Sequence, residues 1–249
     1  MKNGVIQAVA AAAMVTGAAS AQAEAVQWRV EDGGNGHWYR YAFFPEGGRP
    51  FDVVQDEAAA HGGHLATITS SSENEWLKVN VVSQNPSSTI WGPSFGAKLV
   101  GSRWTWVTGE AWNYAAWGGI EPTGDGPYIE FLRYGALHWN DHASASDKWI
   151  IEWSADCNSD GIVDFGQIRA GELDDANANN IPDCCEQGTP CDCPSDLNGD
   201  GVVNGADIGA ILAFWGPNPD FAAADITRDG QVNGADLGAL LSTWGPCGQ

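Results

Sequence analysis

Apolar residues near the C-terminal end of the chain recur twice with the period of a short amphipathic helix. In each stretch four apolar side chains stand at i, i+3, i+4 and i+7, which places them on one helical face. Each stretch ends at a Gly-Pro pair, at 216–217 and 245–246, where a helix cannot continue. The apolar positions are Ile208, Ile211, Leu212 and Trp215 in the first stretch, and Leu237, Leu240, Leu241 and Trp244 in the second. One such face is too small to be stable alone, so we expect the two helices to pack face to face in one core.

The N-terminal half shows a mixed pattern of helices and strands. Residues 51–60 carry apolar side chains on one helical face, whereas residues 64–69 alternate as a strand does. Ser70 and Glu73 form a capping box that predicts a second short helix over 73–82. Further strands are predicted over 89–95, 103–109 and 147–153. The pattern therefore predicts an α+β protein: a mixed domain with two short helices, joined to a small all-α module.

The first 23 residues have the features of a secretory signal peptide. Lys2 precedes an apolar run from Val5 to Ala19, and Ala21-Gln22-Ala23 offers small residues for cleavage. The run is rich in Ala and shorter than the ~20 apolar residues of a membrane-spanning helix. No other stretch reaches this length. We expect a secreted or cell-surface protein, cleaved near Ala23, whose mature chain does not insert into a membrane.

Charge and cysteine are concentrated in the last part of the chain. The formal net charge is -21, and sixteen acidic residues but two basic ones follow Ala155. Such a tail is either disordered or folded around cations that offset its repulsion; either way, nucleic acid is not an expected partner. All six cysteines lie between Cys157 and Cys247. In an exported chain an even number of cysteines indicates disulfides, with zinc as the weaker alternative.

An acidic loop of twelve residues precedes each of the two C-terminal helical patterns. Residues 196–217 and 225–246 are identical at fourteen of twenty-two positions, which makes them an internal duplication. Oxygen-bearing side chains fall at positions 1, 3, 5, 9 and 12, position 6 is Gly, and position 7 offers its backbone carbonyl. Ca²⁺ needs six to eight oxygens in this kind of wrapping loop, whereas the alternative is an Asx-rich surface turn. The expected calcium ligands are Asp196, Asn198, Asp200, Val202, Asn204 and Asp207, and Asp225, Thr227, Asp229, Gln231, Asn233 and Asp236.

Two further loops of the same kind lie upstream. We number the four loops in chain order: loop 1 (156–167), loop 2 (175–186), loop 3 (196–207) and loop 4 (225–236). Loop 2 has Asn180 at position 6, which is tolerable because Asn enters left-handed conformations more readily than most residues. A rigid, turn-rich linker without metal is the alternative for both upstream loops. Their expected ligands are Asp156, Asn158, Asp160, Ile162 and Asp164, and Asp175, Asn177, Asn179, Ile181, Asp183 and Glu186.

The duplicated segment resembles the type I dockerin module over about residues 194–247, with Asp at position 12 where a full EF-hand has Glu. The resemblance implies docking onto a cohesin domain, often in extracellular assemblies that handle polysaccharides. Its partner-binding positions 10 and 11 correspond to Gly205, Ala206, Gly234 and Ala235, which are identical in both copies and suit docking in either orientation.

Loops 1 and 2 resemble the D-x-N-x-N/D-G-I-P-D repeats found between modules of exported bacterial proteins. Full versions of that repeat carry cysteines at positions 2 and 11, which implies a Cys157–Cys185 pair here. Cys193 and Cys247 flank the duplicated module and are placed to clasp its ends. Six cysteines still allow 15 pairings.

The first domain resembles the C-type lectin domain over about 125 residues. The sequence marks are 62–66 (GGHLA), Trp91-Gly92, Trp104-Thr-Trp106, Trp117, Glu121-Pro122-Thr123 and Trp139-Asn140-Asp141. The domain lacks cysteine, with Tyr128 and Trp153 near the usual cysteine positions, so we expect aromatic packing to replace the cross-links. The resemblance implies that a calcium ion beside a cis Pro122 binds vicinal sugar hydroxyls. The implied carbohydrate-binding residues are Glu121, Thr123, Asp125, Asn140 and Asp141.

This sequence departs from the lectin pattern at two positions. Thr123 replaces the usual amide, and Gly126 stands where a Glu ligand is expected, with Asp125 as the nearest substitute. A metal-free or protein-binding face, as in an adhesin, is therefore the alternative to sugar binding. We do not expect an enzyme, because residues 24–156 lack cysteine and the five histidines form no evident acid–base pair. The expected parts are a signal peptide (1–23), a lectin-like domain (26–154), a loop-repeat linker (155–193) and a dockerin-like module (194–249).

Overall fold

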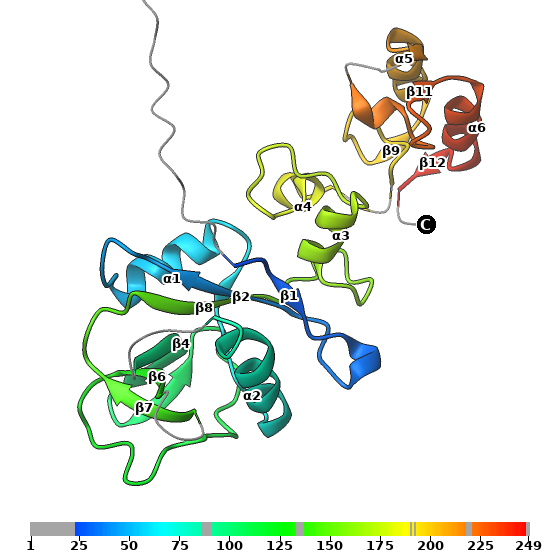
Figure 1. The fold of residues 1–249 in the computed structure, drawn as a ribbon. Helices are drawn as coiled ribbons and strands as arrows, with labels where there is room; N and C mark the ends of the chain where they lie inside the picture. The colour runs from blue at the N-terminus through cyan, green and yellow to red at the C-terminus, as the bar shows by residue number, and fades with distance from the viewer. Residues whose placement is uncertain are drawn as a thin grey trace, which may run out of the picture.

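The computed structural model describes residues 23–85, 91–132, 137–189, 191, 193–217 and 221–247. The predicted signal peptide lies outside the described residues except for Ala23. Three consecutive parts follow along the chain (Figure 1). They are a mixed N-terminal domain, a short middle segment with two helices, and a C-terminal helical module.

The N-terminal domain is built on one eight-stranded sheet with the order β1-β2-β8-β4-β6-β7, to which β3 adds beside β8 and β5 beside β4. The last strand, β8, pairs antiparallel with β2 over six residues, so the two ends of the domain lie side by side. The strands are β1 (Val26–Gln27), β2 (Trp38–Phe43), β3 (His64–Leu65), β4 (Trp91–Val100), β5 (Arg103–Trp106), β6 (Tyr128–Leu132), β7 (His138–His142) and β8 (Lys148–Trp153).

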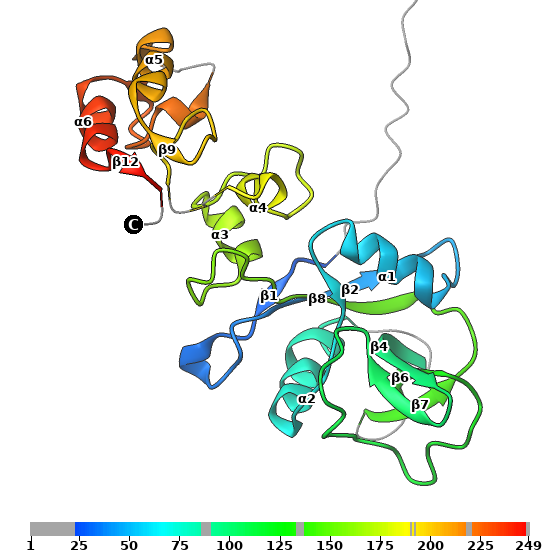
Figure 2. The same ribbon diagram turned by 180° about the vertical axis from the view of Figure 1, so that it is seen from behind.

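Two short helices cover opposite sides of β2 and β8 (Figures 1 and 2). They are α1 (Phe51–Ala59) and α2 (Ser71–Leu77), and α2 continues as a π-helical turn over Lys78–Val82; a 3-10 turn, Val30–Asp32, follows β1. Because strand side chains alternate, β8 contributes to both cores. Its Trp149, Ile151 and Trp153 pack with α1, whereas Ile150 packs with the α2 side.

The larger core is an aromatic cluster around the fully buried Trp139. Trp139 contacts Phe95, Trp106, Trp112, Tyr114 and Trp117, with ring centroids 5.1–6.0 Å apart. Its indole N–H donates to Oδ1 of Asn74 at 2.9 Å. Aromatic pairs of this kind contribute about 0.5–1.5 kcal/mol each beyond the area that they bury. The cluster is consistent with the prediction that aromatic packing replaces disulfides in this domain.

Two local predictions in the domain are modified by the structure. Ser70 caps α2 as expected, because its Oγ accepts from the Glu73 N–H at 3.1 Å. The Glu73 carboxylate, however, accepts from the Thr69 N–H at 2.8 Å rather than from Ser70. The strand predicted over 64–69 is a strand only at His64–Leu65, although the Ala66 N–H still donates to the carbonyl of Ile150.

The C-terminal module pairs two equal halves. Helices α5 (Gly205–Ala213) and α6 (Gly234–Ser242) pack together, and η3 (Ala222–Ala224) precedes loop 4. Strand β9 (Val202–Val203) of loop 3 pairs with β12 (Gly245–Pro246) after α6, whereas β11 (Gln231–Val232) of loop 4 pairs with β10 (Gly216–Pro217) after α5. Each half therefore completes the other, which explains why the sequence carries two copies.

The face-to-face packing of these helices was predicted, but half of its expected members were wrong. Ile211 and Leu240 are fully buried, and Val203 and Val232 from the loops complete the core. Leu212, Trp215, Leu241 and Trp244 are instead 50–59% exposed. The helices end at Ala213 and Ser242, and the next residue has φ near -110°. The Trp residues therefore lie beyond the helical period that was used to place them.

The middle segment contains α3 (Asp164–Ala170) and α4 (Asp183–Gln187). It packs directly on the N-terminal domain, because Phe165 stacks on Trp153 with ring centroids 4.3 Å apart. Val163 joins the same core, and the Asn180 amide donates to the carbonyl of His61 at 3.4 Å. The predicted linker is thus attached to the preceding domain by buried side chains.

Candidate functional site

The four loops share one hydrogen-bond pattern. In each loop the position-1 carboxylate accepts from the backbone N–H groups of positions 5 and 6, at 2.6–3.1 Å. The side-chain oxygen at position 5 in turn accepts from the N–H of position 7, at 2.8–3.0 Å. The oxygens of positions 1 and 5 are thus drawn to the inner side of one turn. The four position-1 residues are Asp156, Asp175, Asp196 and Asp225.

The backbone of the four loops also agrees. Position 6 is left-handed in every loop, including Asn180 with φ 61°, which confirms that Asn can take this place. Position 4 is left-handed as well, which the sequence analysis did not predict. Its residues are Ser159, Ala178, Gly199 and Arg228, with φ 57–71°. Since only Gly occupies this region without cost, loops 1, 2 and 4 hold a strained residue at the same point.

Position 12 of loops 3 and 4 is buried and tied to the backbone. Asp207 and Asp236 are both fully buried. Oδ1 of Asp207 accepts from the N–H of Leu197 and Asn198, and its Oδ2 from that of Asn204. Burial alone would raise the pKa of Asp236, but backbone amides and the Thr227 hydroxyl donate to it and lower that pKa.

The residues at position 9 of loops 3 and 4 act as helix caps. Asn204 accepts from the Ala206 N–H, and Asn233 accepts from the Ala235 N–H, both at 2.8 Å. Each pairs with the position-12 carboxylate in a capping box that starts α5 or α6. The sequence predicted both residues as calcium ligands and missed this capping role, although Asn three residues before an acidic residue was its signal.

In loops 1 and 2 position 9 closes the loop instead. The carboxylate of Asp164 accepts from the Cys157 N–H, and that of Asp183 from the Ala176 N–H, at 3.0–3.2 Å. Burial, followed by the charges of Asp156 and Asp160, raises the pKa of Asp164. A bound cation would relieve this repulsion.

The donor set of the loops fits a hard cation such as Ca²⁺. In loop 3 one backbone amide, that of Asp200, is shared by Oδ1 of Asp196 at 3.1 Å and Oδ1 of Asn198 at 2.9 Å. Side-chain oxygens of positions 1 and 3 therefore meet at one point, as a wrapping loop requires. Loop 2 repeats this sharing, with Asp175 and Asn177 both accepting from the Asn179 N–H.

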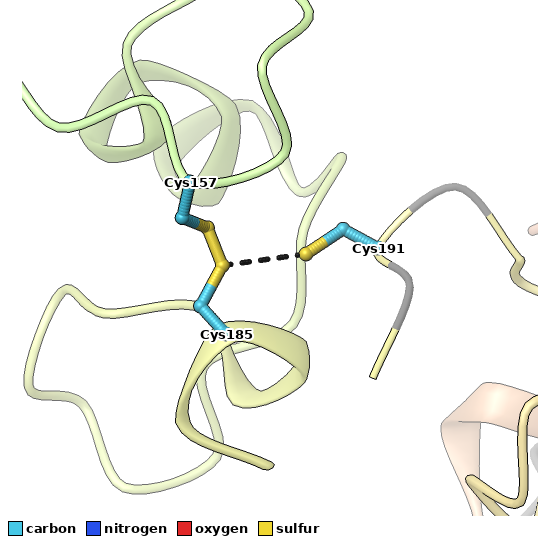
Figure 3. A group of neighbouring side chains, drawn as sticks. All are labelled: Cys157, Cys185 and Cys191. Atoms are coloured by element: carbon cyan, nitrogen blue, oxygen red, sulfur yellow. Dashed lines mark hydrogen bonds between the residues drawn. A yellow bond between two sulfur atoms is a disulfide. The ribbon is translucent and has the colours of Figure 1, made fainter. Parts of the chain in front are cut away.

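The cysteines form disulfides. The predicted pairs Cys157–Cys185 and Cys193–Cys247 are both confirmed, with Cα atoms 6.2 and 5.6 Å apart. Cys184 and Cys191 form the third pair, with Cα atoms 5.2 Å apart. Figure 3 shows Cys191 beside the Cys157–Cys185 bridge, its Sγ 3.4 Å from that of Cys185. Because the described cysteines are all bonded to one another, they offer no thiolate to zinc.

In the N-terminal domain a turn with a cis Glu121–Pro122 bond, as the resemblance implied, packs against Asp141 of β7. Oδ1 of Asp141 accepts from the Thr123 N–H at 2.8 Å, and Oδ2 accepts from the Gly126 N–H at 3.1 Å. The Thr123 N–H also donates to Oε2 of Glu121 at 2.9 Å. Burial opposes the ionisation of Asp141, but these backbone amides lower its pKa.

Asn140 lies on the other face of β7. In the β6–β7 register Asn140 stands opposite Glu130, whereas Asp141 stands opposite Ile129. The Asn140 amide accordingly donates to Oε1 of Glu130 at 3.3 Å and to the backbone carbonyl of Asp141 at 2.9 Å. The structure therefore brings Glu121, Thr123 and Asp141 together, leaves Asp125 exposed at the turn, and directs the Asn140 amide away from them. The period-two alternation of 138–142 was the signal for this separation.

The predicted partner-binding residues begin the two helices of the C-terminal module. Gly205 and Ala206 on α5, and Gly234 and Ala235 on α6, are all exposed. One turn further along each helix lie Gly209 and Gly238, also exposed, and the exposed Leu212 and Leu241 follow. Each helix thus presents an exposed face of small residues, followed by an exposed leucine. We call this face the low face, because its small side chains leave the helix backbone close to the surface.

No helix within the described part of the chain is long and apolar enough to cross a bilayer.

Comparisons with known proteins found one family match and several similar solved structures. Residues 194–241 match the dockerin type I domain. The cow C-type carbohydrate-recognition domain of CD23, solved in the presence of GlcNAc2Man3 oligosaccharide, is 19% identical, with 49% of this chain and 91% of that chain covered and a TM-score of 0.40. Human lithostathine is 14% identical, with 53% and 97% covered and a TM-score of 0.44. The Ca²⁺-independent C-type lectin SPL-2 from Saxidomus purpuratus is 18% identical, with 47% and 86% covered and a TM-score of 0.40. The family match concerns the C-terminal module, and the solved structures named here align with about half of this chain.

Proposed function

We propose that this protein is an exported carbohydrate-binding protein that attaches, through its dockerin domain, to a cohesin-type partner in an extracellular polysaccharide-handling assembly. The observation that carries the sugar-binding part is the meeting of Glu121, Thr123 and Asp141 around the cis Glu121–Pro122 bond. Those oxygens would hold Ca²⁺, and a calcium ion with spare coordination sites accepts neutral sugar hydroxyls.

The docking part is supported by the helical faces of α5 and α6. Gly205 and Ala206 repeat as Gly234 and Ala235, at equivalent exposed positions. A low face allows a partner to approach the helix backbone closely, and the exposed leucines offer apolar area to bury. Because the two halves are equivalent, either helix can serve the same partner. Loops 1 to 4 would hold Ca²⁺ through their position 1, 3 and 5 oxygens and thereby fix the helices.

A second function is favoured by the position of Asn140. If its amide stays on Glu130, the calcium site loses one expected ligand, and the turn at 121–126 becomes a protein-binding face of an adhesin. This candidate uses the same fold without sugar.

A glycan array separates the two functions. The folded full-length mature protein is probed in calcium and in EGTA, beside Asp141→Ala and a control, Asp56→Ala, which removes an exposed carboxylate from α1. A glycan whose signal EGTA and Asp141→Ala abolish, and Asp56→Ala leaves intact, supports the lectin function. An array without signal in calcium favours the adhesin.

Docking is tested by binding to purified type I cohesin domains. Ala206→Glu or Ala235→Glu alone should leave binding nearly unchanged, because the other half remains competent. The double variant should lose it, since docking on either low face would then bury an unpaired charge in the complex. Loss of binding with one single variant would show that the two halves are not equivalent.

A further inference from the structure

A pocket of about 390 Å³ lies on the N-terminal domain, and none of its lining residues belongs to the turn at 121–126. It is formed where β4 begins, β7 ends and β8 begins, with Glu130 of β6 in its lining. The volume is at the lower end of the range for ligand pockets, about 300–1,000 Å³. Its walls are Trp91, Glu130, His142, Ser144–Ser146, Asp147 and Lys148.

Glu130 supplies the pocket with an unsatisfied polar group. Its side chain is only 5% exposed, and Oε1 accepts the long 3.3 Å hydrogen bond from Asn140. Within the described residues Oε2 has no hydrogen-bond partner. A ligand in the pocket that donates a hydrogen bond to Oε2 would pair this oxygen.

Two other polar side chains of the pocket, Lys148 and His142, already have partners. Nζ of Lys148 donates to Oδ1 of Asp147 at 2.6 Å, and Nε2 of His142 is 3.0 Å from Oγ of Ser94. Burial lowers the pKa of His142 and so favours its neutral form. The buried Lys148 ammonium disfavours a second cation, and the carboxyl group of Glu130 disfavours an anion. A neutral ligand rich in hydroxyl groups fits this balance.

Trp91 provides the apolar wall. It is the first residue of β4 and is 50% exposed at the pocket. One face of a pyranose ring presents C–H groups that pack on an aromatic face and bury apolar area, while the hydroxyls at its edge remain free to bond. A half-exposed indole beside a buried carboxyl oxygen is the arrangement that such a ring needs.

We propose that this pocket is a second saccharide site, which binds a neutral pyranoside without calcium by stacking it on Trp91 and hydrogen bonding it to Oε2 of Glu130. None of its walls comes from the turn at 121–126 or from the four loops. The site therefore does not depend on the sugar binding proposed above.

Saturation-transfer NMR on the full-length mature protein in EDTA tests this site. The probes are cellotetraose, mannotetraose and chitotetraose, with Nα-acetylarginine amide as a cationic probe. We expect at least one saccharide to bind, and Trp91→Ala or Glu130→Ala to weaken it at least tenfold. Asp141→Ala should leave this binding unchanged, as should Phe43→Ala, which removes a comparably exposed aromatic residue that does not line the pocket.

Three results would overturn the proposal. The first is that protein with a native near-ultraviolet spectrum binds no saccharide in EDTA. The second is that saccharide binding survives both pocket substitutions. The third is that only the arginine probe competes, which would assign the pocket to a cationic peptide. Trp91→Phe keeps an aromatic wall and should retain most of the affinity, so it separates loss of stacking from loss of folding. Calcium-dependent binding that Asp141→Ala removes would concern the first site only.

Discussion

Single residues carry strain in the four acidic loops at a point that the sequence did not reveal. Ala178 occupies position 4 of loop 2 with φ 57°, where a non-glycine residue costs about 1–2 kcal/mol. The equivalent residue of loop 3 is Gly199, which takes φ 71° freely. The spacing of the expected oxygen ligands could be predicted because it depends on side-chain chemistry. The left-handed conformation of position 4 could not be predicted, since residues as different as Ser, Ala, Gly and Arg occupy it in the four loops.

We therefore expect Ala178→Gly to stabilise the middle segment by about 0.5 kcal/mol, because relief of strain exceeds the added entropy of an unfolded glycine, about 0.4–1 kcal/mol. Ala176→Gly is the matched control: it lies two residues away, is exposed, and is not left-handed. That variant should destabilise instead. Amide hydrogen exchange over 155–189 measures both, and the same sign for the two variants would contradict the argument.

Glu130 makes stability depend on pH. Burial is the main reason that its pKa rises to about 7, and the charge of Asp147 adds to it, while Asn140 and Lys148 oppose it. The folded state then binds more protons than the unfolded state between pH 4.5 and about 7. Stability from this group is complete below pH 4.5 and is lost as pH rises through about 7.

Glu130→Gln should remove this dependence. A difference of about 2.5 pH units at about 1.36 kcal/mol each gives at most about 3 kcal/mol. We expect the variant to gain up to that much over the native protein at pH 8 and to gain nothing at pH 4.5. Urea unfolding followed by tryptophan fluorescence at both pH values measures it. A gain that is equal at the two values would show that packing, not ionisation, is responsible.

At the scale of elements, an interior glycine in each helix of the C-terminal module lowers the stability of that module. Gly209 and Gly238 stand in the interiors of α5 and α6, and an added Cβ would meet nothing within 4 Å at either. Replacing both with Ala should stabilise the module by about 1–2 kcal/mol, since each interior helical glycine costs about 0.5–1 kcal/mol. Thermal unfolding in calcium measures the gain.

Gly166 of α3 gives the matched contrast. It too lies inside a helix, but a Cβ there would come within 2.9 Å of Nε1 of Trp38. Gly166→Ala should therefore destabilise the contact between α3 and the N-terminal domain, where Phe165 stacks on Trp153. If Gly166→Ala raised the unfolding temperature as the α5 and α6 variants do, helix propensity alone would decide the effect and that packing would be unimportant.

Helices α1, α2, α5 and α6 and strands β3, β4, β5 and β8 were predictable because their signals are local, whereas α3, α4 and the other strands were not predicted. Apolar spacing located α1 and α5, and Ser70 marked the start of α2. The burial of whole faces was not predictable in the same way. Trp215 and Trp244 are exposed because Phe214 and Thr243 leave the helix, and Asn140 is separated from Asp141 by strand register. Both outcomes depend on tertiary pairing, which the apolar pattern does not contain.

At the scale of the whole molecule, acidic loops occupy the middle and C-terminal parts, whereas the N-terminal domain is held by aromatic cores. The buried clusters of the N-terminal domain include Trp139 and Trp149 but none of the expected calcium ligands. The C-terminal core is small, built around Ile211 and Leu240, and is flanked by the Cys193–Cys247 disulfide. Removing calcium should therefore affect the two ends of the chain differently.

We expect EGTA to leave residues 26–154 folded and to unfold residues 194–247. Without calcium the loop carboxylates repel one another, and the small apolar core of that module does not offset this repulsion. Limited proteolysis with mass spectrometry, with the disulfides intact, should show cleavage confined to the C-terminal part. Asp196→Ala with Asp225→Ala should show the same cleavage in calcium, whereas the control Asp56→Ala should not. The disulfide constrains the unfolded chain and opposes this loss by a few kcal/mol, so a second arm with reduced protein shows the full effect. A C-terminal part that resists protease in EGTA even after reduction would mean that its apolar core suffices, and the loops would then have no role in holding it together.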